Sequence, residues 1–316
     1  MLNWPPVYDA SYRPDPDSPY WFTEIETMDP EEREQIIILP KLQEQLKYGY
    51  AHSGLYRKKW DAAGVKPEDI RSLEDFEALP ILTKDELRAD QAEHPPFGSN
   101  LCISYNEMGR VHGTSGTTGN PTTFGVSKGD IQRIAETHAR VMWAMGVRPD
   151  DIVFIGSFFS LYWGSWGAML GTERLGATAF PFGAGVPGQS ERAIEWMANV
   201  KPTVFYGTPS YSLYIAEKAK SMGYDPARDF SFRILFFSGE PGAGVPSTRK
   251  RIEETYDAVC LDSGSTGEMA PWMTDGECSH RQGMHLWQDV VYAELVDPET
   301  QKRVPYGDEG VTVYTH

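Results

Sequence analysis

Residues 110–123 read RVHGTSGTTGNPTT, a run of glycines and hydroxyl side chains that contains no acidic residue. Glycine allows the backbone to bend sharply and to approach a ligand closely. Hydroxyl groups and free backbone amides that converge on one concavity bind phosphate oxygens. The stretch therefore predicts a phosphate-binding loop, whose contacts are expected from Thr114, Ser115, Gly116, Thr117, Thr118 and Gly119.

Two other interpretations of this stretch fit less well. A flexible polar linker rarely places Pro-Thr-Thr and an apolar residue, here Phe124, directly after its last glycine. The Walker A loop of a P-loop NTPase needs a lysine directly after its last glycine, whereas the first lysine that follows here is Lys128. An ordinary P-loop NTPase or kinase is therefore not expected.

The composition limits the class of protein. A chain of 316 residues with 40% hydrophobic content is long enough for one large domain or two smaller ones. Its formal charge of -16 argues against a nucleic-acid partner, which needs a basic surface. Three widely separated cysteines, Cys102, Cys260 and Cys278, indicate reduced thiols in a cytoplasmic protein.

Two segments are candidates for a signal peptide or a membrane span, and neither has the expected pattern. The segment 1–22 is rich in proline and aspartate, which is not the pattern of a signal peptide. The uncharged run 152–172 is interrupted by glycines and serines, and it fits a strand, a turn and a core helix better than a membrane span. We therefore expect no membrane partner.

Before the glycine-rich stretch, the sequence predicts an irregular arm over residues 1–26 and then a series of short helices. Asp29 with Pro30 begins the first helix, Pro40 kinks or divides it, and the helix resumes through residues 41–52. Capped short helices are expected to follow from Ser72 and from Thr83.

After that stretch, short apolar strands alternate with amphipathic helices. Strands without polar alternation are typical of parallel sheets that are covered on both faces. We therefore expect an α/β fold with a doubly wound, mainly parallel sheet, whose ligands bind at the carboxyl ends of the strands. The predicted strands are residues 151–155, 177–180, 203–206, 232–237 and 258–261, and the predicted helices are residues 130–145, 163–175, 190–199, 209–222 and 247–256.

The last thirty residues have a different character. Residues 290–296 and 310–314 are predicted strands, and the turn-rich segment 297–300 lies between them. They predict a hairpin that starts a small antiparallel subdomain. The expected division is an arm over 1–26, an α/β core over 27–287 and this hairpin over 288–316, and a chain that ends in or just after a strand is typical of a fragment.

The glycine-rich stretch resembles the phosphate loop of the adenylate-forming superfamily, which includes the acyl- and aryl-CoA synthetases. Four further stretches, residues 146–151, 173–178, 206–211 and 297–300, are similar to the phenylacetate–CoA ligase family, as is the early segment 76–87. The resemblance runs in the expected order over nearly the whole chain. It implies the fold of the family's large N-terminal AMP-binding domain, without the small C-terminal lid domain and its catalytic lysine.

The resemblance also implies a nucleotide site. The segment Ser238-Gly239-Glu240-Pro241, which by itself indicates only a strand-to-helix turn, corresponds to the family's loop along the adenine and the acyl group. Residues 262–268 read DSGSTGE where the family reads DIYGLSE, so Glu268 takes the place of the carboxylate that holds Mg²⁺.

This second segment departs from the family pattern at two positions. Gly264 stands where an aromatic residue stacks on adenine, and Gly267 stands where a hydroxyl meets phosphate. Thr266 could supply that hydroxyl after a shift of one residue. The nucleotide contacts expected in this segment are Asp262, Ser263, Gly264, Ser265 and Thr266.

A set of aromatic residues could line an aryl pocket beside the nucleotide, because ligand pockets are mostly apolar with a few polar anchors. The alternative is that these residues are plain core. The resemblance favours the pocket around residues 206–209, and His112 matches a family histidine that steers the carboxylate or caps the loop. The expected pocket residues are Phe158, Phe159, Tyr162, Trp163, Trp166, Tyr206, Gly207, Thr208, Pro209 and Tyr211.

Three soft metal ligands lie within eight positions: Cys278, His280 and His285. Zinc binds thiolates and imidazoles at such short spacings, usually with a fourth ligand from elsewhere. Cys278 and His285 match a family pattern, in which some members resemble a structural zinc site. No C-x-x-C pair is present, and a loop with a buried cysteine and a hydrogen-bonded histidine is the competing interpretation.

The resemblance implies an AMP-forming acid–CoA ligase, which activates an aromatic or arylacetic acid with ATP and Mg²⁺ and passes it to CoA. Glu268, Thr114 and His112 are the expected catalytic residues. The alternatives are an adenylating enzyme that transfers the acyl group to a carrier protein or an amine, and a nucleotide-binding module without chemistry. A homodimer is left open, and the isolated fragment is expected to be nearly inactive.

Overall fold

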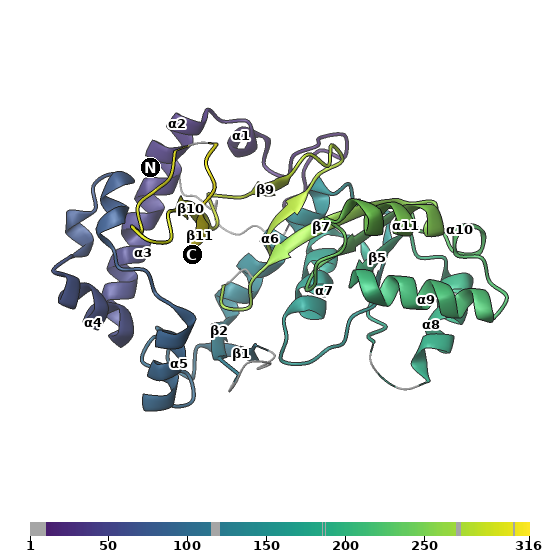
Figure 1. Cartoon of the computed structure of the whole chain (residues 1–316), viewed down its shortest axis with the longest axis horizontal. Helices are drawn as coiled ribbons and strands as arrows, with labels where there is room; N and C mark the ends of the chain where they lie inside the picture. The colour runs from purple at the N-terminus through teal and green to yellow at the C-terminus, as the bar shows by residue number, and fades with distance from the viewer. Residues whose placement is uncertain (1–10, 115–120, 185, 187, 270–272, 306) are drawn as a thin grey trace. The chain divides into compact units, whose positions relative to one another are not determined.

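The computed structural model describes residues 11–114, 121–184, 186, 188–269, 273–305 and 307–316 (Figure 1). It divides the chain into two compact units. Unit 1 contains Glu24–Ile131 and Leu286–His316, and unit 2 contains Ala10–Thr23 and Gln132–His285. Each unit is therefore assembled from segments that are distant in the sequence.

Unit 1 is mainly helical in its first half. The helices are α1 (Thr23–Glu26), α2 (Pro30–Arg33), the π-helical turn η1 (Glu34–Ile38), α3 (Leu39–His52), α4 (Gly54–Ala63) and α5 (Lys84–Glu93), with 3₁₀ turns η2 (Pro67–Asp69) and η3 (Glu74–Ala78). The expected cap at Asp29 is confirmed, because its carboxylate accepts the backbone N–H groups of Glu31 and Glu32. The expected division near Pro40 is the π-helical turn, and Pro40 lies in the first turn of α3, where it needs no amide partner.

Two antiparallel hairpins complete unit 1. The strands β1 (Met108–Gly113) and β2 (Thr123–Ser127) pair on either side of the glycine-rich stretch, a pairing that the sequence did not predict. The strands β10 (Tyr292–Val296) and β11 (Val311–Thr315) form the expected hairpin at the end of the chain. Tyr292 of β10 packs into a core with the buried Leu42, Trp60 and Phe76.

Unit 2 is built on a seven-stranded sheet with the order β4-β3-β5-β6-β7-β8-β9. The pairs between β4, β3, β5, β6 and β7 are all parallel, whereas β8 is antiparallel to β7. The strands are β3 (Ile152–Ile155), β4 (Thr178–Phe180), β5 (Val204–Gly207), β6 (Ile234–Phe237), β7 (Val259–Ser265), β8 (Met273–Glu277) and β9 (Met284–Leu286). The helices are α6 (Lys128–Ala144), which starts in unit 1, α7 (Gly164–Leu175), α8 (Gln189–Val200), α9 (Pro209–Ser221), α10 (Pro226–Asp229) and α11 (Pro246–Tyr256).

The predicted doubly wound α/β fold is confirmed. All five predicted parallel strands and the five helices between them form within a few residues of the expected bounds. The run 152–172 contains β3 and most of α7, as expected. Among the described residues, β8, β9 and α10 were not predicted, and β7 is longer than expected.

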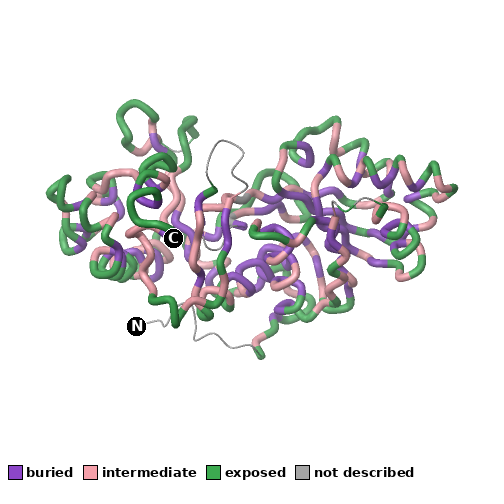
Figure 2. The backbone as a smooth tube through the Cα atoms, turned by 90° about the horizontal axis from the view of Figure 1, so that it is seen from below, coloured by how far each residue is buried: buried purple, intermediate pink, exposed green. Residues whose placement is uncertain are grey.

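The two faces of the sheet are covered by different helices. Successive residues of a strand point to opposite faces, so Phe205 and Tyr206 of β5 belong to different layers. Phe205 lies in a core with α8, α9 and α11, which includes Ile194, Ile215 and Ile252. Helix α7 contacts β3 and β4, and its Gly171 packs against α6. Figure 2 shows buried residues concentrated along the strands.

The strand order defines where a ligand can bind in unit 2. Strand β4 lies on one side of β3 and β5 lies on the other, so the chain reverses its direction across the sheet at this point. In open α/β sheets the crevice for a ligand opens at such a switch point, outside the carboxyl ends of the strands. The segments that follow β3, β5 and β6 are therefore the first place to look for a site.

The N-terminal segment of unit 2 has little regular structure, yet it is firmly packed. Trp21 is buried, donates from its indole N–H to Glu136 at 2.6 Å, and meets Trp143 edge-to-face at 5.6 Å. Arg174 of α7 pairs with the same Glu136 carboxylate and lies 5.2 Å from the Trp21 ring. Within the described parts of the chain, no helix is long and apolar enough to cross a membrane.

Candidate functional site

The residues that directly follow β3 and β6 are hydrogen-bonded to the carboxyl end of β5 at the switch point of unit 2. The backbone N–H of Gly156, after β3, donates to the carbonyl oxygen of Tyr206 at 2.7 Å. The N–H of Ser238, after β6, donates to the carbonyl oxygen of Gly207 at 3.2 Å. The hydroxyls of Tyr206 and Ser238 are 2.8 Å apart and buried. Burial raises the pKa of the Tyr206 phenol well above its ordinary value, and the neighbouring Tyr162 adds to the effect.

Tyr162 covers this pair of hydroxyls. A Cβ atom on Gly164 would lie 2.4 Å from the Tyr162 ring and 3.0 Å from the Tyr206 hydroxyl. A Cβ atom on Gly239 would lie 3.2 Å from the Tyr162 hydroxyl, and Gly239 has a φ of +89° that favours glycine. The absence of side chains at both glycines thus makes room for one phenol ring beside Ser238.

The structure gathers only part of the expected aromatic pocket. Phe158 is 51% exposed, with its ring 6.1 Å from that of Tyr162, so these two residues and Tyr206 share one region. Phe159 packs edge-to-face on Trp166 at 5.0 Å, and the Trp166 indole donates to the carbonyl oxygen of Ser160. Trp163 is buried.

Tyr211 belongs to the other face of the sheet. Its ring stacks with that of Phe205, in the core beneath α8, α9 and α11. Tyr211 is therefore not part of the predicted pocket with Tyr206, although the two residues are close in the sequence. Thr208 caps this helix by accepting the N–H of Tyr211 at 3.3 Å, and Pro209 occupies the first turn.

The carboxylate of Glu240 points to the start of α9. Its Oε1 accepts the backbone N–H of Ser210 at 2.7 Å. Pro241 is exposed, and the next residue, Gly242, lies so close to Pro209 that a Cβ atom would be 2.7 Å from the proline ring. The segment after β6 is therefore fastened to the segment after β5 by its side chains as well as its backbone.

The segment 262–268 continues β7 and turns at its end. Ser263 is buried and donates to the carbonyl oxygen of Phe237 at 2.8 Å, next to Ser238 in the neighbouring strand. Burial raises the pKa of the Asp262 carboxyl, and the nearby Glu277 raises it further. The Thr266 hydroxyl donates to Oε2 of Glu268 at 3.0 Å. The side chain of Ser265 lies outside what the structure describes.

Gly264 has a structural partner that the sequence did not reveal. It pairs with Asp275 across the antiparallel strands β7 and β8. A Cβ atom on Gly264 would lie 1.9 Å from a carboxylate oxygen of Asp275. The aspartate side chain thus occupies the space next to Gly264, and only the strand register of β8, which was not predicted, could have identified it.

In unit 1, the ends of the glycine-rich stretch are held together by two threonines. The N–H of Thr114 donates to the carbonyl oxygen of Thr122 at 3.0 Å, and the N–H of Thr122 donates to the Thr114 hydroxyl at 3.1 Å. His112 is buried at the end of β1. The expected phosphate contacts Ser115, Gly116, Thr117, Thr118 and Gly119 lie outside the described residues.

Gln91 of α5 holds the strand that follows this stretch. Its carboxamide donates to the carbonyl oxygen of Thr123 at 2.8 Å and accepts the N–H of the same residue at 3.0 Å. Gln91 is buried. Sequence reasoning missed this residue, because nothing in a helical glutamine indicates a partner 32 positions away.

The three expected soft ligands lie at the end of unit 2. The sulfur of Cys278 and Nδ1 of His280 are 3.8 Å apart, and His280 and His285 are both exposed. Among the residues that the structure describes, no group of three or more His, Cys, Asp or Glu side chains is arranged to hold a metal ion.

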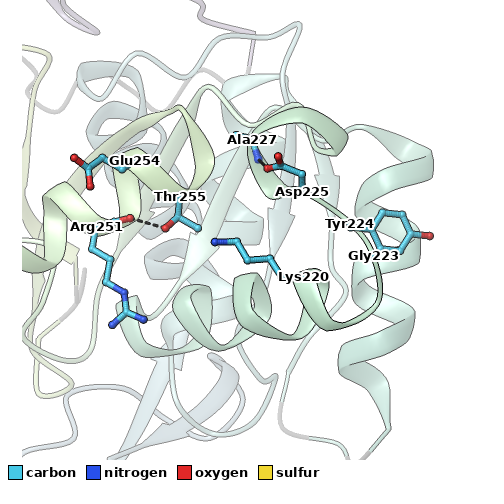
Figure 3. Close-up of a pocket in the computed structure, with 8 residues that line it drawn as sticks. All are labelled: Lys220, Gly223, Tyr224, Asp225, Ala227, Arg251, Glu254 and Thr255. Atoms are coloured by element: carbon cyan, nitrogen blue, oxygen red, sulfur yellow. Dashed lines mark hydrogen bonds between the residues drawn. The ribbon is translucent and has the colours of Figure 1, made fainter.

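A separate pocket of about 600 Å³ opens between α9, α10 and α11 (Figure 3). In Figure 3 the Lys220 side chain extends towards Thr255, whose hydroxyl donates to the carbonyl oxygen of Arg251. Helix α9 starts at the carboxyl end of β5, so its last turn and this pocket lie at the opposite edge of the sheet. We assign the pocket no part in the site, because ligands of such sheets bind at the carboxyl edge.

Comparisons with known proteins identify the family of the chain. The family described as "AMP-binding enzyme" matches residues 79–314. The phenylacetate–coenzyme A ligase of Aromatoleum evansii is 34% identical over 277 residues, which cover 88% of this chain and 61% of that protein. The corresponding ligase of Escherichia coli (strain K12) is 33% identical over 294 residues, which cover 91% of this chain and 65% of that protein.

Solved structures of a 2-hydroxyisobutyryl-CoA ligase are also similar. One of them, in complex with 2-HIB-AMP and CoA in the thioesterification state, is 50% identical to this chain with a TM-score of 0.95. The match covers 99% of this chain and 66% of the ligase chain. An open conformation of the ligase is 49% identical with a TM-score of 0.95, and 72% of that chain is covered. The chain spans about three fifths of the length of the curated relatives that it matches.

Proposed function

The chain belongs to the AMP-binding enzyme family and is homologous to phenylacetate–CoA ligases, and from this premise we propose that it is part of an AMP-forming acid–CoA ligase. We propose that this part of the enzyme binds ATP and the carboxylic acid. The observation that carries the proposal is the hydrogen-bonded set formed by the carboxyl end of β5 and the segments after β3 and β6, at the switch point of the sheet. In open α/β sheets, ligands bind outside the carboxyl ends of the strands at such a point.

In the proposed reaction, a carboxylate oxygen of the acid attacks the α-phosphorus of ATP. A bond forms between this oxygen and phosphorus, the bond from the α-phosphorus to the bridging oxygen breaks, and pyrophosphate leaves. The deprotonated thiol of CoA then attacks the carbonyl carbon of the acyl-adenylate, and AMP leaves. Positioning and charge stabilisation supply most of the catalysis in phosphoryl chemistry.

The glycine-rich stretch is the proposed phosphate-binding segment, as its sequence predicts, and the segments after β3 and β6 are the proposed contacts of the acyl and adenine groups. The backbone N–H of Thr114 donates to the carbonyl oxygen of Thr122, and the N–H of Thr122 donates to the Thr114 hydroxyl, so these two residues hold the ends of the stretch together. His112 is proposed to steer the carboxylate from the end of β1.

Glu268 is the proposed ligand for Mg²⁺. Its carboxylate is half-buried and accepts the Thr266 hydroxyl, and carboxylate oxygens are among the ligands that Mg²⁺ takes in proteins. Magnesium would neutralise phosphate charge when it is bound. The zinc site at Cys278, His280 and His285 remains a prediction, and metal analysis of the purified protein tests it.

For the acid, we propose a short 2-hydroxy acid. Three hydroxyl-bearing side chains lie close together, those of Tyr162 in the segment after β3, Tyr206 of β5 and Ser238 after β6. Tyr206 and Ser238 are buried, so the half-buried Tyr162 is the one that we propose a substrate hydroxyl reaches. The 2-hydroxyisobutyryl-CoA ligase with 50% identity gives this acid further support. An aromatic or arylacetic acid is the second candidate, which the exposed Phe158 and the similarity to phenylacetate–CoA ligases favour.

Acid-dependent exchange of pyrophosphate into ATP by the full-length protein tests the proposal. We expect exchange with 2-hydroxyisobutyrate, and much less with isobutyrate, which lacks only the hydroxyl. The substitution Tyr162→Phe should lower that preference by about tenfold or more, since a site built to bond a hydroxyl rejects an analogue without it. Preference for phenylacetate would favour the second candidate.

The assay also separates the other classes of protein. A thioester that forms only when CoA is present supports a CoA ligase. Transfer to an amine or a carrier protein without CoA would indicate a different adenylating enzyme. If neither 2-hydroxyisobutyrate, isobutyrate nor phenylacetate supported exchange, the result would favour a nucleotide-binding module without chemistry.

A further inference from the structure

We propose that Glu240 is a positioning residue that fixes the segment after β6 to the first turn of α9 and thereby sets the affinity and selectivity for the acid. The inference rests on the proposed function and deepens it. Glu240 lies in a segment that the sequence resemblance assigns to nucleotide contact. Its carboxylate, however, is 2.7 Å from the backbone N–H of Ser210.

The hydrogen-bond donors at the start of α9 show why this carboxylate matters. The first amides of a helix have no partner inside the helix and must find one elsewhere. Pro209 has no N–H, and the N–H of Tyr211 is accepted by the Thr208 hydroxyl. The N–H of Ser210 between them is accepted by Glu240. A carboxylate at this position is also stabilised by the dipole of the thirteen-residue helix.

The segment after β6 makes three more contacts, two with the carboxyl end of β5 and one with the start of α9. The N–H of Ser238 donates to the carbonyl oxygen of Gly207, and the Ser238 hydroxyl bonds to that of Tyr206. Gly242 lies against the Pro209 ring at a distance that excludes any side chain. Glu240 contributes the one contact in this set that joins a charged side chain to the helix.

The consequence concerns the shape of the acid site. Tyr206 belongs to β5, which leads into α9, and Ser238 belongs to the segment after β6, so the contact between Glu240 and Ser210 helps to hold these two residues together. The Tyr162 ring lies close to Gly164 and its hydroxyl lies close to Gly239. Loss of the Glu240 contact would free the segment after β6 to move relative to β5. The hydroxyl cluster that selects the acid would then lose its fixed geometry, although no ligand-contacting atom has been removed.

Two substitutions of the full-length protein test this role. Glu240→Ala removes both the acceptor and the charge. Glu240→Gln keeps an acceptor for the Ser210 N–H without the charge, and it serves as the conservative rescue. The matched control is Asp225→Ala, because Asp225 caps α10 in the same unit by accepting the N–H of Ala227 at 3.1 Å, at the opposite edge of the sheet.

We expect Glu240→Ala to raise KM for the acid by about tenfold or more and to lower the preference for the 2-hydroxy acid, since small displacements in an active site are costly. Glu240→Gln should recover most of both values, and Asp225→Ala should leave both unchanged. Hydrogen exchange of the Ser210 amide should be faster in Glu240→Ala than in the parent protein.

Parental KM and selectivity in Glu240→Ala would overturn the proposal, as would an equal change in Asp225→Ala. Unchanged exchange of the Ser210 amide in Glu240→Ala would overturn the contact itself, whether or not the protein is active. Absence of activity in the parent protein with every acid would instead count against the proposed function.

Discussion

At the scale of single residues, the site of unit 2 depends on side chains that are missing as much as on those that are present. Gly164 and Gly239 leave room for Tyr162, and Gly264 leaves room for Asp275. A Cβ atom at Gly239 or Gly264 would contact a residue on another segment, and one at Gly164 would contact both the neighbouring Tyr162 and the Tyr206 hydroxyl of β5. Each of these glycines therefore marks a close approach between two segments of the chain.

The substitution Gly264→Tyr tests the approach of Asp275. We expect it to lower the free energy of unfolding by about 1–3 kcal/mol, the usual cost of forcing extra atoms into a packed site. The double substitution Gly264→Tyr with Asp275→Gly should be closer to the parent protein than the single one, because the carboxylate no longer competes for the space. Urea denaturation of the four proteins of this cycle measures the coupling, and additive effects would contradict the contact.

His138 gives the stability of unit 2 a dependence on pH. It is fully buried between α6 and α7, and burial lowers its pKa from 6.5 to about 4. The unfolded chain therefore takes up a proton below about pH 6.5 that the folded protein does not bind until about pH 4. Stability from this histidine is complete above pH 6.5 and is lost as the pH falls through that window, by roughly 3 kcal/mol in total.

Denaturation curves between pH 4 and pH 7, the range set by these two pKa values, test the role of His138. We expect the free energy of unfolding of His138→Gln to depend less steeply on pH than that of the parent protein, because glutamine does not titrate. His94→Gln, at an exposed position, is the control and should keep the parental slope. Equal slopes in all three proteins would show that His138 is not the cause.

At the scale of elements, short polar contacts fix where helices and strands begin. Thr83 and Glu86 form a reciprocal capping box at the start of α5, and Asp29 caps α2. Such signals lie within three or four residues of each other and can be found in a sequence. Gln91 is different, because it bonds both backbone groups of Thr123 and acts like a short strand beside β2.

The carboxamide of Gln91 is well suited to this task, since it carries one donor and one acceptor side by side. Gln91→Glu keeps the shape but replaces the donor by an acceptor that faces the Thr123 carbonyl. We expect a loss of about 1–3 kcal/mol in the free energy of unfolding, which is the cost of an unsatisfied buried group. Chemical denaturation measures it.

Gln45→Glu is the matched control for Gln91→Glu, because Gln45 is exposed on the helix α3. Its effect should stay within about 0.5 kcal/mol, as for most surface substitutions. If both glutamates cost the same, the bonds to Thr123 contribute nothing to stability.

At the scale of the whole molecule, the chain enters unit 2 twice. Of the described residues, 11–23 belong to unit 2, the chain then forms most of unit 1, and it returns to unit 2 at Gln132. The contacts of Trp21 with Glu136, Trp143 and Arg174 join the first visit to the second. Unit 2 is therefore expected to depend on its N-terminal segment, although that segment contains little regular structure.

The substitution Trp21→Ala measures this dependence. We expect it to lower the free energy of unfolding of unit 2 by about 3–5 kcal/mol, as for other buried aromatic residues replaced by alanine. Trp196→Ala is the control, because Trp196 is 48% exposed on α8. Urea titrations that give the same midpoint for both variants would contradict a structural role for the segment.

The sequence alone determined the fold class, the succession of parallel strands and helices along the chain, and the family of this protein. A strand of consecutive apolar residues, such as residues 204–207, must be buried on both faces of the sheet. This follows from the composition of the strand alone, without knowledge of its neighbours. The hydroxyls and glycines of residues 113–119 are likewise local, so a phosphate loop could be expected without any knowledge of its neighbours.

Only the tertiary structure decided which side chains meet. It separated Tyr206 and Tyr211 onto opposite faces of the sheet, turned Glu240 towards Ser210, and brought Asp275 over Gly264. These outcomes depend on strand register and on how closely two segments approach. Both are set by contacts between residues that are distant in the chain, and no local pattern contains that information.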